Sequence, residues 1–297
     1  MAMLFKNSIH QESFDHEGFV VIDDFFNNEE LSELENLLEN FEQYTEALID
    51  GTDGTINSVE KGIFFTRHFK DLDLEEQMRS KLANIACKSL KRFLNIEYKT
   101  VAALGIYKEP NSPESIVPMH VHHSNLAPGS ALPGISMFAP LNNLDDDLGP
   151  LAFIKGSQKL WENDLSYSLT YMEQSYPEIY PIMRSYLTNL YPISGQAILF
   201  NQFTIHEGFP NCHKSLGRLA LTAEFIPSSE TCVLFLPEWG GKGEVAALHG
   251  KEVLKLPFEF SDEHRWVPRN LGEEVKTINP YKVREISKEE FLHCCEK

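Results

Sequence analysis

The sequence predicts a mainly β protein, a sandwich or barrel of short strands, with helices at its flanks. From Val101 onward, short apolar runs alternate with clusters of Gly, Pro and Asn, which is typical of strands joined by tight turns. Many short strands separated in this way favour a sandwich or a barrel. The apolar runs are residues 101–107, 135–141, 151–154, 196–200, 218–226 and 232–236.

The first hundred residues predict helices around one strand, residues 18–22. Asn27 or Asn28 can cap a helix whose leucines then recur at helical spacing on one face. A second amphipathic helix is expected over residues 74–94. Both helices are interpreted as packing supports, because their apolar faces need a sheet to cover.

No repeat or change of composition divides the chain, so we expect one domain over residues 1–297. Its parts are a mainly helical support, a β core with a helical insert, and a C-terminal extension that is irregular and wraps over the core. Their expected bounds are 1–100 for the support, 101–236 for the core, 173–190 for the insert and 237–297 for the extension.

Composition excludes several classes of protein. The formal charge is −18, from 26 basic and 44 acidic residues, and such a surface repels phosphate backbones, so no nucleic-acid partner is expected. No segment approaches the roughly 18 apolar residues that span a bilayer, so no membrane partner is expected. The five cysteines are scattered and odd in number, which favours a reducing, cytoplasmic location. Cys294 and Cys295 beside His293 are either a metal cluster or ordinary thiols at a frayed end.

A histidine cluster carries the chemistry. In an extended segment, residues two apart project to the same side, so His120 and His122 can reach one metal ion while His123 faces away. His206 closes an apolar strand and can supply a third imidazole. Arg218 begins the next strand, where a buried guanidinium needs an anion and suits a carboxylate.

Each of these residues also has a simpler interpretation. A histidine pair alone is weak evidence for a metal, and a lone arginine on a strand is more often a surface cation. The weight comes from the ordered set: a His-x-His strand, an apolar strand ending in histidine, and an arginine on the strand that follows.

At this point the chain resembles the phytanoyl-CoA dioxygenase-like branch of the iron(II)/2-oxoglutarate oxygenases. His120-Val121-His122 stands where that family has its His-x-Asp motif, and Arg218 stands where the family keeps an arginine for the far carboxylate of 2-oxoglutarate. The resemblance implies a double-stranded β-helix, a jelly-roll or cupin-like core. It also involves the segments 14–26, 141–151, 154–158, 195–200 and 206–211.

The resemblance implies a non-haem enzyme that uses Fe(II), 2-oxoglutarate and O2 to hydroxylate, desaturate or cyclise a small organic metabolite. His120, His122 and His206 would hold the iron, and Arg218 would bind the co-substrate. Four further residues are candidates for substrate contact by position only: Tyr107, Asn125, Ser136 and Gln202.

One departure from the family pattern is His122, which replaces the usual carboxylate. Three neutral imidazoles leave a bound iron one unit more positive, and the same donor set also suits zinc. We favour ligation by His122; the alternatives are that it swings away or that oxygenase chemistry is lost. Two other functions therefore stay open, a three-histidine metalloenzyme without 2-oxoglutarate (a cupin-type dioxygenase or a zinc enzyme) and a non-catalytic binding protein.

Overall fold

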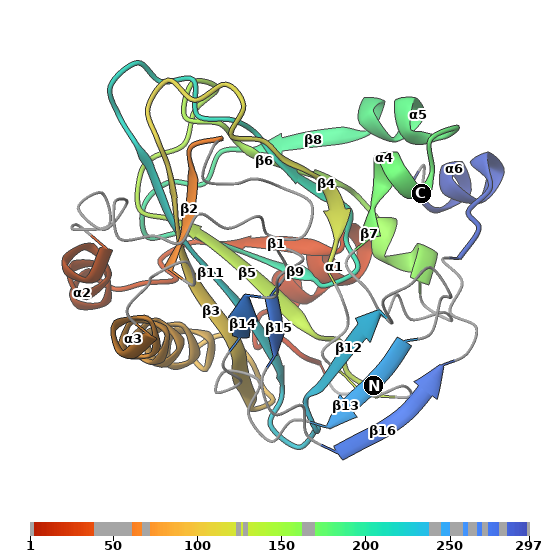
Figure 1. Cartoon of the computed structure of the whole chain (residues 1–297), viewed down its shortest axis with the longest axis horizontal. Coiled ribbons are helices and arrows are strands. Elements are labelled where there is room, and N and C mark those ends of the chain that lie inside the picture. Colours follow the sequence, from red (N-terminus) through yellow and green to blue (C-terminus); the bar gives the residue numbers. More distant parts are fainter. Residues whose placement is uncertain are drawn as a thin grey trace.

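A computed structural model describes eleven parts of the chain, and Figure 1 shows their arrangement. Two antiparallel sheets form the core, as the sequence predicts for a double-stranded β-helix. The described residues are 3–38, 61–66, 72–122, 126, 130–161, 170–237, 245–249, 258–260, 266–268, 273–278 and 284–295.

The larger sheet has six strands in the order β1-β9-β5-β11-β3-β2, and the smaller has five in the order β7-β4-β10-β6-β8. Strands distant in sequence are neighbours in both sheets, which is how a jelly roll is built. The larger sheet contains β1 (Phe19–Ile22), β9 (Ala197–Asn201), β5 (Ile135–Pro140), β11 (Arg218–Pro227), β3 (Tyr98–Lys108) and β2 (Ile63–Phe65). The smaller contains β7 (Thr170–Tyr171), β4 (Val117–Val121), β10 (His206–Gly208), β6 (Leu151–Ile154) and β8 (Leu187–Leu190).

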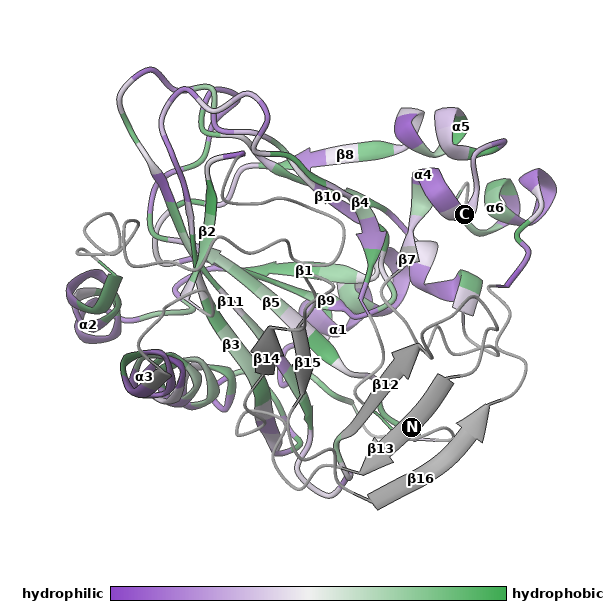
Figure 2. Cartoon of the chain, in the orientation of Figure 1, coloured by the Kyte–Doolittle hydropathy of each residue, from purple (hydrophilic) through white to green (hydrophobic). Residues whose placement is uncertain are grey.

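The larger sheet is buried on both faces, which explains its long apolar runs. On β11, Leu221 and Phe225 pack outward in a cluster that includes residues of the N-terminal helices. Ala220, on the opposite face, packs with aromatic residues from both sheets. Figure 2 shows these central strands as largely hydrophobic. Alternation along β11 therefore sorts its residues into an outer face and an inner face between the sheets.

Three helices cover the outer face of the larger sheet. They are α1 (Ser8–Glu17), α2 (Asn28–Leu38) and α3 (Leu72–Leu90). The sequence predicted the last two, although α3 ends at Leu90 rather than at residue 94. The short strand β2 was missed, because three residues carry too little periodicity to be recognised.

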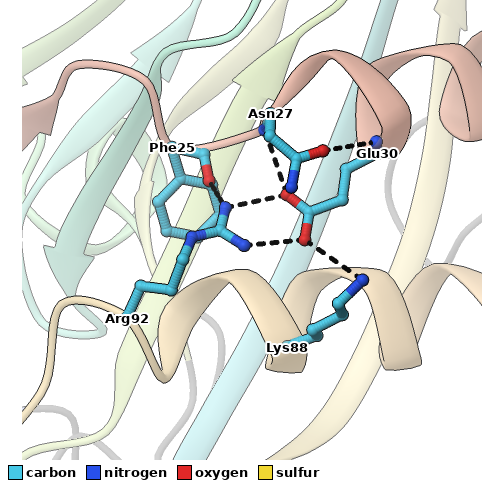
Figure 3. Close-up of polar contacts among 5 residues, drawn as sticks. All are labelled: Phe25, Asn27, Glu30, Lys88 and Arg92. Carbon is cyan, nitrogen blue, oxygen red and sulfur yellow. Dashed lines mark hydrogen bonds and ion pairs between the residues drawn. The ribbon is translucent and has the colours of Figure 1, made fainter.

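A buried carboxylate joins α2 to α3 (Figure 3). Glu30 is only 1% exposed, and both its oxygens accept hydrogen bonds from the guanidinium of Arg92, each at 2.7 Å. The backbone N–H of Glu30 donates to the side-chain oxygen of Asn27 at 2.9 Å, and the backbone N–H of Asn27 donates to the Glu30 carboxylate at 3.0 Å, which is a capping box. Arg92 reaches on to the backbone oxygen of Phe25, so one ion pair fixes the helices together.

The smaller sheet is covered on its outer face by a second group of helices. These are α4 (Met172–Ser175), α5 (Tyr180–Ser185) and the C-terminal α6 (Lys288–Cys295), which gather on one side of Figure 1. Phe291 of α6 is fully buried and contacts Tyr186 edge to face, with ring centroids 5.4 Å apart.

The expectation of an irregular C-terminal extension was wrong. Described segments there form strands and α6, and these elements are too short for apolar periodicity to reveal them. The strands of the extension are β13 (Val245–His249), β14 (Phe258–Phe260), β15 (Trp266–Pro268) and β16 (Glu273–Ile278), and they follow β12 (Val233–Pro237), which the apolar run 232–236 predicted. Cys294 and Cys295 lie on helix α6 and pack against its hydrophobic cluster, so the end is not frayed there. Among the described residues, no helix has the length and apolar character needed to cross a membrane.

Candidate metal centre

Three predicted histidines meet on the smaller sheet. His120 of β4 and His206 of β10 are register partners on adjacent antiparallel strands, and His122 follows directly after β4. One ring nitrogen from each lies within 4.8 Å of the others, and theirs is the one such group found among the described residues. The closest ring centroids, those of His120 and His206, are 4.2 Å apart. The structure therefore brings together residues that stand 86 positions apart in the chain.

One ring nitrogen of His120 and of His206 is already engaged in a hydrogen bond. His120 Nδ1 donates to the backbone oxygen of Pro118 at 2.7 Å, and His206 Nδ1 donates to that of Thr204 at 2.9 Å. A carbonyl oxygen can only accept, so Nδ1 carries the proton in both rings. This leaves Nε2 of both rings unprotonated, with a free lone pair, which is the form that binds a metal.

Burial keeps these rings neutral. It lowers the pKa of His120 to about 3, with repulsion from His122 as the second cause. Burial also lowers the pKa of His206 well below its ordinary value, helped by repulsion from both other histidines. Neutral imidazoles in a buried, converging set fit a divalent transition metal such as iron(II) or zinc.

His122 differs from the other two histidines in what its Nδ1 faces. That atom lies 2.9 Å from the hydroxyl of Ser136 on β5 and 3.2 Å from the carboxylate of Glu224 on β11. Its ring is also within 5.3 Å of the His120 ring, measured between centroids. The third histidine is thus held by the larger sheet, while the first two are held by backbone of their own segments.

Two cations lie buried between the sheets. Arg218 and Lys108 are register partners at one end of β11 and β3. The guanidinium of Arg218 donates to the backbone oxygens of Gly149 at 2.7 Å and Phe209 at 3.4 Å, and its buried Nε has no partner. The ammonium of Lys108 also donates to Phe209, at 2.7 Å.

The electrostatics of this pair are unfavourable. Burial lowers the pKa of Arg218 to about 10, and burial together with repulsion from Arg218 lowers the pKa of Lys108 well below its usual range. No carboxylate of the described residues lies within ion-pair distance of either cation. Backbone oxygens alone compensate a buried charge poorly, so this end of the interior is suited to an anion.

Sequence reasoning missed both Lys108 and Glu224. Each carried a usable signal, because a charge stood within or at the end of an apolar strand. Counting by twos from Arg218 puts Glu224 on the same face of β11. Lys108 required the pairing of β3 with β11, which no local pattern supplies.

The four residues suggested for substrate contact have different positions. Ser136 is buried against His122, as described above, and Gln202 is 1% exposed with a side-chain nitrogen that has no partner. Tyr107 lies on the outer face of β3, packed against Phe64 and Gly217, so it does not face the histidines. Asn125 lies outside the residues that the structure describes.

The family comparison decides the relationship. The model of the phytanoyl-CoA dioxygenase (PhyH) family matches residues 14–218, a stretch that includes the three histidines and ends at Arg218. The chain belongs to the phytanoyl-CoA dioxygenase family. Membership of this family, together with the three-histidine centre, supports an oxygenase.

Solved structures agree with the phytanoyl-CoA dioxygenase fold. AviO1 from Streptomyces viridochromogenes Tue57 is similar over 77% of this chain and 98% of its own, with a TM-score of 0.53 and 18% identity. The carbocyclase SnoK from nogalamycin biosynthesis is described as non-heme and alpha ketoglutarate dependent; it matches 76% of this chain and 86% of its own (TM-score 0.51, 12% identity). The epimerase SnoN, crystallised with Fe3+, alpha ketoglutarate and nogalamycin RO, matches 76% and 85% (TM-score 0.51, 14% identity). No curated protein sequence matches the chain.

Proposed function

We propose that the protein is an iron(II)- and 2-oxoglutarate-dependent oxygenase acting on a small organic metabolite. The observation that carries this proposal is the convergence of three ring nitrogens within 4.8 Å, all from residues inside the stretch that the family model matches. His120, His122 and His206 would hold the iron through Nε2, since Nδ1 of each ring is engaged elsewhere. The metal would supply the redox chemistry that activates O2.

Arg218 and Lys108 would bind the far carboxylate of 2-oxoglutarate. A planar guanidinium can donate two parallel bonds to a carboxylate, and the unpartnered Nε of Arg218 is one such donor. A dianion would also relieve the repulsion between these two buried cations. The proposal thus explains why two cations lie in the interior without an ion-pair partner.

The inner face between the sheets would receive the substrate. Leu104 and Ile106 of β3 and Thr222 of β11 all point inward, yet each keeps contact with solvent. A hydrophobic wall with few polar groups suits a small organic molecule. The overall reaction would convert substrate, 2-oxoglutarate and O2 into hydroxylated product, succinate and CO2.

Other outcomes are compatible with the same centre. SnoK is named a carbocyclase and SnoN an epimerase, so the shared fold also hosts chemistry other than hydroxylation. Hydroxylation is our default, and desaturation or cyclisation would need only a different placement of the target C–H bond.

The donor set favours a second candidate function. Because the three nitrogens come without a carboxylate, the site also suits a three-histidine metalloenzyme that does not use 2-oxoglutarate, such as a cupin-type dioxygenase or a zinc enzyme. Lys108 and Arg218 argue for the first candidate, since such an enzyme has no need of a buried dicarboxylate subsite.

Succinate release tests the proposal. Protein loaded anaerobically with Fe(II) and then given O2 and 2-oxoglutarate should form succinate slowly even without substrate. His206→Ala should abolish this turnover, and His16→Ala, which changes an exposed histidine on α1, should leave it intact. Tight metal binding without any succinate from the iron-loaded protein would favour the second candidate, and absence of metal binding would exclude both.

A further inference from the structure

The positive charge of the metal centre needs a nearby negative charge, and the ligand set does not provide one. Three neutral imidazoles around a divalent ion leave two positive charges, whereas a set with one carboxylate leaves one. In a low-dielectric interior this difference is costly unless an anion lies nearby. The position that lacks the carboxylate is His122.

Glu224 is the carboxylate next to that position. It lies on β11 directly opposite Ser136 on β5, and both side chains project toward His122. Ala223 and Phe225, its neighbours in sequence, pack in the outer cluster, so alternation directs Glu224 to the inner face. Its side chain is 16% exposed, and one oxygen lies 3.2 Å from His122 Nδ1.

The three histidines differ in one informative respect. His120 and His206 donate Nδ1–H to neutral backbone oxygens, and His122 alone faces a charged acceptor. The residue with the charged acceptor is the one that stands where the family has an acid. This coincidence is expected if the negative charge has moved from the ligand itself to the residue behind it.

We propose that Glu224 is a positioning residue that, together with Ser136, fixes His122 with Nε2 toward the metal and supplies the missing negative charge. Accepting the Nδ1 proton holds one tautomer and makes the imidazole a stronger donor, as carboxylate–histidine pairs do at other metal sites. The inference rests on the proposed function only in requiring a metal at the three histidines.

A double-mutant cycle on metal affinity tests this role. Co(II) serves as the probe, with its visible absorption reporting the ligand geometry and a competing chelator giving the Kd. Glu224→Gln should weaken binding by about 10- to 100-fold, because removal of such a partner usually has that effect. Glu97→Gln, which removes a carboxylate that is 68% exposed and pairs with Lys91, controls for the change of net charge.

The second background is His122→Asp, which returns a carboxylate to the ligand set. There, Glu224→Gln should no longer weaken Co(II) binding and should even strengthen it, since Glu224 would then face another anion. A purely structural glutamate would show the same loss of Co(II) affinity in both backgrounds, because its contribution to folding does not depend on which residue ligates the metal.

A measurement on the wild-type protein avoids the risk that a variant misfolds. In Zn(II)-loaded protein, the His122 Nδ1 proton should resonate downfield of those of His120 and His206, since it alone donates to a carboxylate. Binding of zinc through His122 Nδ1 would overturn the inference, and so would unchanged Co(II) affinity in Glu224→Gln; the proposed oxygenase would survive either result. A wild-type protein that binds neither ion would overturn both.

Discussion

Replacing Arg218 with methionine separates a co-substrate-binding arginine from a structural one. Methionine keeps much of the side-chain volume and removes the charge. Burial lowers the pKa of Arg218 from 12.5 to about 10, and each pKa unit corresponds to about 1.4 kcal/mol, so holding this charge inside costs roughly 3 kcal/mol. Below pH 10 the arginine is charged both in the folded and in the unfolded chain, so at neutral pH the whole penalty applies.

The contacts of Arg218 offset this penalty only in part. Its one short hydrogen bond, 2.7 Å to the Gly149 oxygen, contributes about 1.5–3 kcal/mol as a bond from a charged donor. The two terms nearly cancel, so Arg218→Met should change the unfolding free energy of the ligand-free protein by no more than about 1–2 kcal/mol. Breaking a buried ion pair would instead cost about 3–5 kcal/mol.

The assay is thermal or urea unfolding with and without 2-oxoglutarate, in the presence of Mn(II) as a redox-stable stand-in for iron. At a hundredfold excess over its Kd, 2-oxoglutarate should stabilise the wild type by about 2.7 kcal/mol and the variant hardly at all. Arg92→Met provides the contrast, because it leaves the buried Glu30 with only the longer ion pair to Lys88, at 3.8 Å: it should lose stability and keep the response to 2-oxoglutarate. A full response to 2-oxoglutarate in Arg218→Met, or a loss of 3 kcal/mol or more without ligand, would show that Arg218 is a structural residue.

Three further outcomes follow from buried charges. Lys108→Met should raise the melting temperature of the ligand-free protein, by removing a desolvated cation that repels a neighbouring one, and should weaken 2-oxoglutarate binding in a calorimetric titration; a lower melting temperature would contradict this. The metal-free protein should lose stability as pH falls from about 6.5 toward 3, because His120 and His206 gain protons only when unfolded. The loss should reach about 1.4 kcal/mol per pH unit for each histidine. Urea midpoints that stay constant over this range would refute this prediction. Glu30→Ala should lower the unfolding free energy by about 1.5–3 kcal/mol, since it removes the bonds to Arg92 and the capping box of α2 while the partly exposed Arg92 keeps contact with water. A loss below about 1 kcal/mol by chemical denaturation would show that the pair is not important.

The sequence revealed those parts of the fold that depend on local signals. The start of α2 was predictable because Asn27 and Glu30 form a capping box, in which every contact lies within four residues. The long strands of the β core were predictable because a strand buried on both faces is an unbroken apolar run. Short strands were missed: the partly exposed β8 (Leu187–Leu190) falls in the expected helical insert, and β13 to β16 lie in a segment that was expected to be irregular.

The site was predictable to the extent that alternation determines it. His120 and His122 share a face because they are two residues apart, and this holds whatever strand lies beside them. Alternation also implies that Tyr107 and Lys108 face opposite ways, but it cannot say which of them faces inward. That choice depends on the pairing of Lys108 with Arg218, which joins segments 110 residues apart. The same non-local pairing puts Glu224 opposite Ser136, and for this reason the sequence alone gave no partner for His122.

The charges between the two sheets make sense only as a set. On the inner face of β11, the carboxylate of Glu224 lies near the histidines, and toward the other end of the strand lie two cations, Arg218 and Lys108. A divalent metal and a bound 2-oxoglutarate dianion cancel each other, and Glu224 cancels Arg218. With His122 in the place of a ligand carboxylate, Glu224 keeps one negative charge beside the three histidines. The exchange of that carboxylate for His122 and the presence of Glu224 behind it are therefore best understood as one compensated change.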